Sequence, residues 1–155
     1  MLEIVYPKTW WFKLCEKVIP SRCREIPEAT DPNQILLRQV AIWREHIYLQ
    51  QFASSENLDF YHTHPWSHGT IAIGLYGKLA EWLPSGPIYR KIWKAPYFRY
   101  MGPQFLHSSA PFGPGHTSVF IGLGKKTNRK YYHAASDAEA SIHWEDHIIK
   151  KVKRL

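Results

Sequence analysis

The feature that most constrains this chain is a succession of short apolar segments, separated by proline and glycine, that begins at Gln34. In residues 69–76 and 117–123 the apolar side chains alternate with other residues, which is the period of a half-buried strand. Many short strands with turn signals between them are typical of a β-sandwich or a barrel. We therefore predict an all-β fold with strands near 35–43, 45–53, 69–76, 78–83, 88–94, 96–101, 104–108, 117–123 and 129–133.

The two ends of the chain have a different period. Within residues 8–19 the apolar side chains recur at three- and four-residue steps, which predicts a short helix that Pro20 closes. The face of this helix would consist of Trp10, Trp11, Leu14, Cys15, Val18 and Ile19. Residues 20–33 are rich in proline and charged residues and indicate an irregular connection. A short C-terminal helix is predicted because three apolar residues share one side of a helical wheel: Ile142, Ile149 and Val152.

A length of 155 residues corresponds to one domain. We expect residues 1–34 to form an N-terminal extension that packs on the barrel and residues 35–155 to form a single domain. With 45% hydrophobic and 21% charged residues, the composition excludes a disordered or collagen-like chain. Cys15 and Cys23 are not a Cys-x-x-Cys pair, which argues against a disulfide framework or a thiolate zinc site. No apolar run is long enough to cross a membrane, so we expect a cytoplasmic protein.

The net charge of +7 does not by itself indicate a nucleic-acid partner. Basic residues massed on one face suit contacts with phosphates, whereas a solvated turn and a solvated tail explain the same clusters. We favour the second interpretation and do not expect nucleic acid as a partner. The clusters are Lys125, Lys126, Arg129 and Lys130, and Lys150, Lys151, Lys153 and Arg154.

The sharpest local motif is a group of three histidines at positions 62, 64 and 68. If the segment is a strand, His62 and His64 lie on the same face, because side chains alternate with a period of two, and their rings can converge on one point. His68 has the same even offset and reaches the same side if Pro65 does not turn the chain. His107, in a predicted strand further along, is the best candidate for a ligand from another strand.

Histidine chemistry leaves two interpretations of this motif. Neutral imidazole is a common protein ligand for zinc, iron, copper and nickel. Three histidines with open coordination positions are typical of a catalytic metal centre, and a closed shell of four ligands is typical of a structural one. The alternative is a set of surface or hydrogen-bonded imidazoles that bind no metal, and both interpretations stay open on spacing alone.

The histidines and the segments around them resemble the cupin family. The resemblance to the first cupin motif rests on His62-Thr63-His64, on His68 where that motif has its glutamate, and on Gly77 at the end of the next strand. Gly102-Pro103 followed by His107 resembles a reduced second motif. The usual glycine five residues ahead of the His-x-His is absent, and a histidine replaces the acidic ligand.

Within that family the chain is similar to small stand-alone cupins of phage and bacterial genomes. The similarity runs from Glu45 to Ile148 and does not cover residues 1–34. It rests on the segments 62–66, 75–77 with Glu81, 117–122, 129–132 and 143–146.

The resemblance implies a double-stranded β-helix, which is a jelly-roll barrel, with a metal in its mouth. His62, His64 and His107 would hold the metal, with His68 as a possible fourth ligand. The cofactor would be a divalent transition metal, namely Fe, Zn, Mn or Ni. Because dimers are common among cupins, the resemblance also implies a possible homodimer.

Several further side chains are candidates for binding a small-molecule ligand. Trp66 and Tyr76 could line an aromatic pocket, although core packing explains such rings equally well. Arg90 and Arg99 lie on predicted strands and could hold a substrate carboxylate or phosphate through two parallel hydrogen bonds, or could be exposed with no ligand. Glu81 could act as an acid or a base near the mouth, or could face solvent.

These observations favour a metal-dependent enzyme that acts on a small polar or anionic substrate in the barrel mouth. Iron(II) would permit oxygen activation, as in a dioxygenase, and zinc or manganese would permit Lewis-acid isomerisation or hydrolysis. We favour oxygenase-like chemistry because an all-histidine shell has no carboxylate to donate charge. The alternative is a non-catalytic cupin module with a binding or structural role, such as one associated with a phage.

Overall fold

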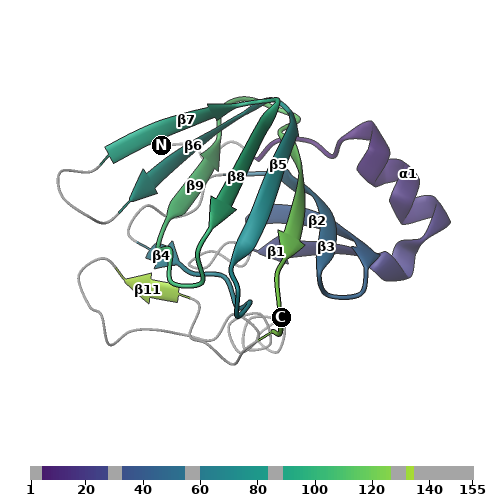
Figure 1. Ribbon diagram of the computed structural model, residues 1–155. Coiled ribbons are helices and arrows are strands. Elements are labelled where there is room, and N and C mark those ends of the chain that lie inside the picture. The colour runs from purple at the N-terminus through teal and green to yellow at the C-terminus, as the bar shows by residue number, and fades with distance from the viewer. Residues whose placement is uncertain (1–4, 28–32, 55–59, 84–88, 127–131, 135–155) are drawn as a thin grey trace.

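The computed structural model describes residues 5–27, 33–54, 60–83, 89–126 and 132–134 (Figure 1). In these residues it contains one α-helix, one 3-10 turn (Pro20–Arg22) and eleven strands. The helix is α1 (Trp10–Val18), and the strands are β1 (Cys23–Pro27), β2 (Ile35–Trp43), β3 (Ile47–Phe52), β4 (Phe60–His62), β5 (Thr70–Tyr76), β6 (Lys78–Leu83), β7 (Tyr89–Lys94), β8 (Tyr97–Met101), β9 (Ser108–Pro111), β10 (Thr117–Gly122) and β11 (Tyr132–Ala134).

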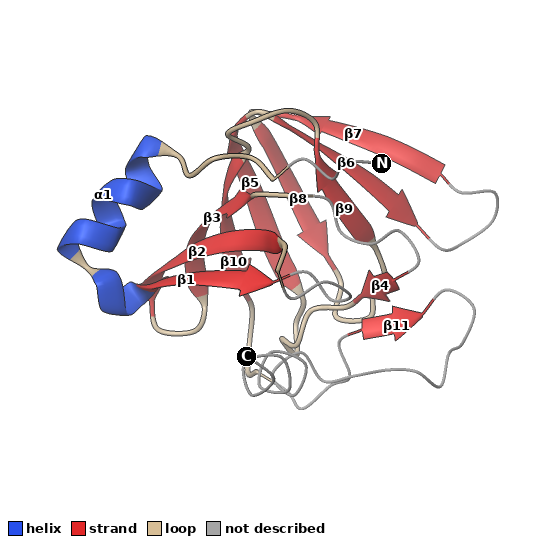
Figure 2. Ribbon diagram, turned by 180° about the vertical axis from the view of Figure 1, so that it is seen from behind, coloured by secondary structure: helices blue, strands red, loops and turns tan. Residues whose placement is uncertain are grey.

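The strands form two layers around a common interior. One layer is a six-stranded sheet in the order β1-β2-β3-β10-β5-β8, and the other combines the sheets β7-β6-β9 and β11-β4. Every pairing is antiparallel. An isolated bridge between His62 and His107 connects β4 to the start of β9. This arrangement is a cupin-like jelly roll, so the predicted all-β fold class is confirmed (Figure 2).

The interior between the layers is packed by two apolar clusters. The smaller one joins Leu36 and Phe52 of the six-stranded sheet to Leu79 of β6, and therefore spans both layers. The larger cluster consists of Tyr48, Trp66, Ala72, Tyr97, Met101 and Phe120. Burying each large ring of this kind stabilises the fold by roughly 1.5–3 kcal/mol.

Helix α1 lies outside the barrel beside the β1-β2-β3 end of the six-stranded sheet (Figures 1 and 2). It begins after Thr9, whose Oγ1 accepts a hydrogen bond from the Phe12 amide, as expected of an N-cap threonine. The predicted apolar face is wrong for Trp10, Leu14 and Val18, which are exposed, whereas its other three residues, Trp11, Cys15 and Ile19, are half-buried. The residue that the helix buries completely is Phe12, so the side of the helix that carries Phe12 faces the sheet.

The extension before residue 35 contacts the barrel in two ways. The Thr9 amide donates to the Gln51 side chain at 3.1 Å, and the Trp11 indole donates to Thr117 Oγ1 at 3.2 Å. β1 adds a strand to the six-stranded sheet by pairing with β2. The irregular connection predicted for residues 20–33 is therefore wrong over Cys23–Pro27.

Two further expectations need comment. The strand predicted at 104–108 begins only at Ser108, because a turn from Gly102 to Phe105 occupies the earlier residues. The predicted C-terminal helix lies outside the described residues. In the part of the chain that the structure describes, no helix is long and apolar enough to cross a membrane.

Candidate metal centre

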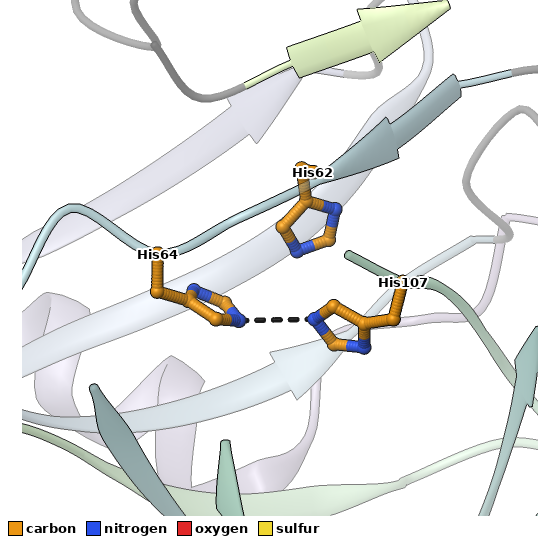
Figure 3. Close-up of side chains that lie close together, drawn as sticks. All are labelled: His62, His64 and His107. Carbon is orange, nitrogen blue, oxygen red and sulfur yellow. Dashed lines mark hydrogen bonds between the residues drawn. The ribbon is translucent and has the colours of Figure 1, made fainter. Parts of the chain in front are cut away.

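Three histidines meet where the two sheets of the second layer join. His62 is the last residue of β4, and His64 follows it just beyond the strand. The backbones of His62 and His107 exchange two hydrogen bonds, of 2.9 and 3.1 Å, which fixes His107 opposite β4. Figure 3 shows the three rings pointing toward one another from these two segments. The convergence thus comes from a bridge between segments and not from a continuous strand through His64.

The geometry of the three rings fits a metal ion. All three side chains are buried, and one nitrogen of each lies within 4.8 Å of the others. His64 Nε2 and His107 Nε2 are 3.0 Å apart. Two ligand nitrogens that are each 2.0–2.1 Å from one ion, at angles of 90–110°, are separated by about 2.8–3.4 Å. The three histidines could therefore hold a divalent metal.

The protonation of the rings agrees with this role. Burial is the main cause that lowers the pKa of His62 and of His64 well below 6.5, and the neighbouring His107 and Arg99 lower both further. Burial also lowers the pKa of His107, against the opposing effect of Glu81. At neutral pH the rings are neutral, which is the form that coordinates a metal.

A buried carboxylate orients the third histidine. His107 Nδ1 donates to Glu81 Oε1 at 2.8 Å, so its Nε2 carries the lone pair and faces His64. Glu81 also forms an ion pair with Arg99 and accepts from the Trp93 indole at 3.0 Å. Burial alone would raise the pKa of Glu81, but these partners outweigh it and lower the pKa to about 2. A carboxylate behind a ligand histidine fixes its tautomer and strengthens it as a ligand.

Two of the predicted ligand-binding side chains face the interior. Trp66 is buried, and its ring contacts Phe120 with 5.5 Å between ring centroids. Arg99 is also buried, and its guanidinium is bound to Glu81. Both line the cavity described below. Glu81 is buried in the same cluster and does not face solvent.

The other predicted site residues lie elsewhere. His68 is exposed, and its Nδ1 is 3.0 Å from Ser67 Oγ, so the structure does not bring it to the three histidines. Tyr76 is 66% exposed and does not line the cavity. The backbone of Arg90 belongs to β7, but its side chain lies outside the described residues.

The histidines open onto a cavity of about 80 Å³ between the two layers. Its opposite wall is the inner face of the six-stranded sheet, with polar residues that we did not predict as site residues. A polar side chain at an inward position of an apolar strand is the signal that could have found them. They are Arg24, Gln39, Gln50 and Ser118.

Comparisons with known proteins support the fold and add little about activity. No family model matches the chain, and no curated protein sequence matches it. Among solved structures it is similar to hydroxypropylphosphonic acid epoxidase from S. wedmorenis, with a TM-score of 0.50 and 7% identity. The similarity covers 68% of this chain and 57% of that protein, so the chain spans little more than half of its structural neighbour. Fold and site together define a cupin-like barrel with a three-histidine centre.

Proposed function

We propose that this protein is a small metal-dependent enzyme of the cupin type, which acts on a small polar or anionic substrate in the cavity. The observation that carries the proposal is the meeting of three buried, neutral histidines at one wall of that cavity. Neutral imidazoles that converge on one point are the donor set of a divalent transition metal.

The shape of the centre supports a catalytic role over a structural one. Three protein ligands leave at least one coordination position for another group, and the nearby cavity has room for it. Such a metal would act as a Lewis acid or, in the case of iron(II), would activate oxygen. His62, His64 and His107 would hold it, and Glu81 would keep His107 in the ligating tautomer.

The cavity walls favour oxygenase-like over isomerase-like chemistry. Isomerisation by proton transfer needs a base whose pKa lies near neutrality. Among the described residues, no aspartate or glutamate lines the cavity, and Glu81 is held behind His107. Burial raises the pKa of Tyr97, which does line the cavity, to about 12, so its hydroxyl stays protonated. Chemistry centred on the metal needs no such base.

Metal analysis tests the proposal directly. Protein purified without an affinity tag is expected to contain, or to take up on titration, about one equivalent of iron, zinc, manganese or nickel per chain. Uptake of cobalt(II) with visible absorption bands typical of nitrogen ligation would locate the metal at histidines. A protein that neither contains nor takes up any of these metals would contradict the proposal.

Replacing the orienting carboxylate sharpens the same test. Glu81→Gln keeps the shape of the side chain but removes its charge, and loss of such an orienting group lowers metal affinity by about 10–100-fold. Glu25→Gln is the matched control, because Glu25 pairs with Arg38 and Lys8 and lies away from the histidines. Equal metal affinity of the two variants would show that Glu81 has no role in the centre.

A further inference from the structure

Helix α1 presents an apolar stripe to solvent. Trp10, Leu14 and Val18 are 77%, 52% and 69% exposed. They follow one another at four-residue steps, which places them on one side of the helix. Phe12 lies on the opposite side, because residues two positions apart are separated by about 200° around a helix axis. Since Phe12 is buried against the sheet, the stripe points away from the barrel.

Two lysines are interleaved with this stripe. Lys13 and Lys17 each lie three residues after a member of the stripe, which makes them its direct neighbours on the helix surface. Both are exposed, and among the described residues neither has an acidic partner. The acidic residue of the helix, Glu16, is paired with Lys8 at 2.6 Å. The solvent-facing side of α1 thus carries apolar and cationic groups and no anionic group.

The same kind of surface continues past the end of the helix. Arg22 of the 3-10 turn is exposed and donates from Nη1 to the Ile42 carbonyl at 3.4 Å. Ile42 and Trp43, at the end of β2, are 48% and 59% exposed. Figures 1 and 2 both show the β2–β3 turn beside the C-terminal end of α1. Glu45, an exposed acid in this turn, is paired with Lys126 at 3.2 Å. We call Trp10, Leu14, Val18, Ile42 and Trp43, together with Lys13, Lys17 and Arg22, the α1 patch.

The α1 patch exposes a large apolar area for a protein of this size. Its five apolar side chains leave roughly 500–600 Å² in contact with water, if a large side chain offers about 150–250 Å². The largest apolar patch on a typical monomer is about 300–600 Å², and patches of that size are often binding surfaces. The area therefore indicates that an apolar partner covers the α1 patch.

The interleaved cations distinguish between the possible partners. A second copy bound about a two-fold axis would bring the cations of one α1 patch against those of the other, and like charges repel. A nucleic acid would pair with the cations but would leave Leu14 and Val18 in water. A bilayer with anionic headgroups suits both kinds of side chain, because apolar groups enter the acyl boundary while lysines reach the phosphates. Tryptophan is enriched at this interface.

We propose that the α1 patch binds the surface of an anionic lipid bilayer, with α1 parallel to the membrane plane. Trp10 and Trp43 are then the anchors at the level of the headgroups, and Lys13, Lys17 and Arg22 contact the lipid phosphates. The net charge of +7 adds a general attraction to the same surface. Because α1 lies outside the barrel, this inference uses a different surface from the metal centre and does not rest on the proposed function.

Co-sedimentation with lipid vesicles tests the inference. The full-length protein is mixed at low ionic strength with vesicles of phosphatidylcholine alone, or of phosphatidylcholine with about 30% phosphatidylglycerol. Each lysine or arginine near an anionic surface contributes a factor of roughly five to binding. The wild type is therefore expected to bind the anionic vesicles at least about 25-fold more tightly than the neutral ones.

A pair of apolar variants locates the contact. Trp10→Ser removes the most exposed apolar side chain of the α1 patch and should lower the affinity for anionic vesicles about tenfold or more. Phe98→Ser is the matched control, because Phe98 is an aromatic residue of β8 that is 65% exposed and lies outside the α1 patch. This control should bind as the wild type does.

A pair of charge variants tests the role of the cations. Lys13→Gln combined with Lys17→Gln should lower the affinity for anionic vesicles about 25-fold and leave the affinity for neutral vesicles unchanged. Lys91→Gln combined with Lys94→Gln makes the same change of charge at exposed lysines of β7, and it should retain wild-type binding.

Four results would overturn the inference. The first is a wild type that does not prefer the anionic vesicles, and the second is a Trp10→Ser variant that binds them as the wild type does. The third is a Trp10-dependent dimer in sedimentation velocity, which would make the partner a second copy. The fourth is a single-stranded oligonucleotide that binds in a Trp10-dependent way and more tightly than the vesicles. If circular dichroism shows that Trp10→Ser does not fold, Val18→Ser decides with the same expected loss.

Discussion

The two walls of the cavity are built in different ways. One wall carries Arg24, Gln39, Gln50 and Ser118 on the regular six-stranded sheet, where the register of four strands aligns these side chains. The histidines come from the three-residue strand β4, the segment after it, and the bridge at His107. One wall therefore depends on many backbone hydrogen bonds and the other on a few. The comparison teaches that the candidate metal ligands lie on the less regular wall, while the regular sheet forms the wall that faces them.

Removing one histidine should have the largest effect. His64→Ala deletes one of three converging nitrogens, and we expect it to abolish binding of the metal equivalent, because two imidazoles hold an ion far more weakly than three. The measurement is metal content after dialysis. His68→Ala is the control, because His68 is exposed and outside the cluster, and it should retain the metal. If His68→Ala lost the metal and His64→Ala kept it, the centre described above would be wrong.

Acidification should have the second largest effect. It should destabilise the fold through a buried histidine at the far end of the sheet. His116 is fully buried, its Nε2 lies 3.0 Å from the Tyr97 hydroxyl, and burial lowers its pKa to about 4. Because its pKa in the unfolded chain is near 6.5, the unfolded state takes up the proton first as the pH falls. Between pH 6.5 and 4, this linkage should remove about 3 kcal/mol from the free energy of unfolding.

Urea unfolding of metal-free protein at pH 7 and pH 5 measures this effect. His116→Gln keeps a partner for Tyr97 but cannot titrate, so it should lose less stability than the wild type between the two pH values. The buried histidines of the metal centre shift the stability in the same direction in both proteins, so the difference isolates His116. An equal loss in wild type and variant would mean that His116 is not neutral and buried in solution.

A methyl group on the regular wall should have a smaller effect. Gly74 lies under the Tyr97 ring, and a Cβ at this position would come within 2.1 Å of Tyr97 Cε1. Gly74→Ala should push the ring away and lower the free energy of unfolding by about 1–3 kcal/mol, as overpacking does. Gly102→Ala is the control, since nothing lies within 4 Å of its added methyl group. Equal urea midpoints for the two variants would contradict this packing.

The smallest effect is expected at a position that lies on neither wall of the cavity. Tyr76 is 66% exposed, so Tyr76→Ala should change the free energy of unfolding by no more than about 0.5 kcal/mol. Metal content should equal that of the wild type. A loss of the metal would mean that Tyr76 reaches the cavity in solution.

The sequence pattern predicts strands well where neighbouring residues decide them. The segments 35–43 and 78–83 match β2 and β6 residue by residue, because alternation and turn residues mark them locally. The pattern does not predict β1, because Ile26 is its one large apolar residue and its pairing with β2 is a contact between distant residues. It predicts helix α1 but not the buried face of that helix, because one docked ring decides which side faces the sheet.

In the candidate site, too, some features are decided by neighbouring residues and others by contacts between distant residues. The His-x-His spacing is a local signal, and it is enough to identify His62 and His64 as candidate ligands from the sequence alone. The contact between His107 and Glu81, and the alignment of Gln39 with Gln50, depend on strand register. Register is set by the whole sheet and cannot be read from a short stretch of residues.

The bridge at His62 and His107 has a consequence for how the chain holds together. The candidate ligands His64 and His107 lie on the two sides of this bridge and are 43 residues apart in the sequence. An ion bound to both would therefore cross-link the chain and close a long loop. If the ion stays bound when the chain unfolds, the cross-link reduces the conformational entropy of the unfolded chain, as a disulfide does. An ion that binds only the folded chain adds stability in proportion to the logarithm of its free concentration. In that case the free energy of unfolding would rise with the free concentration of the metal.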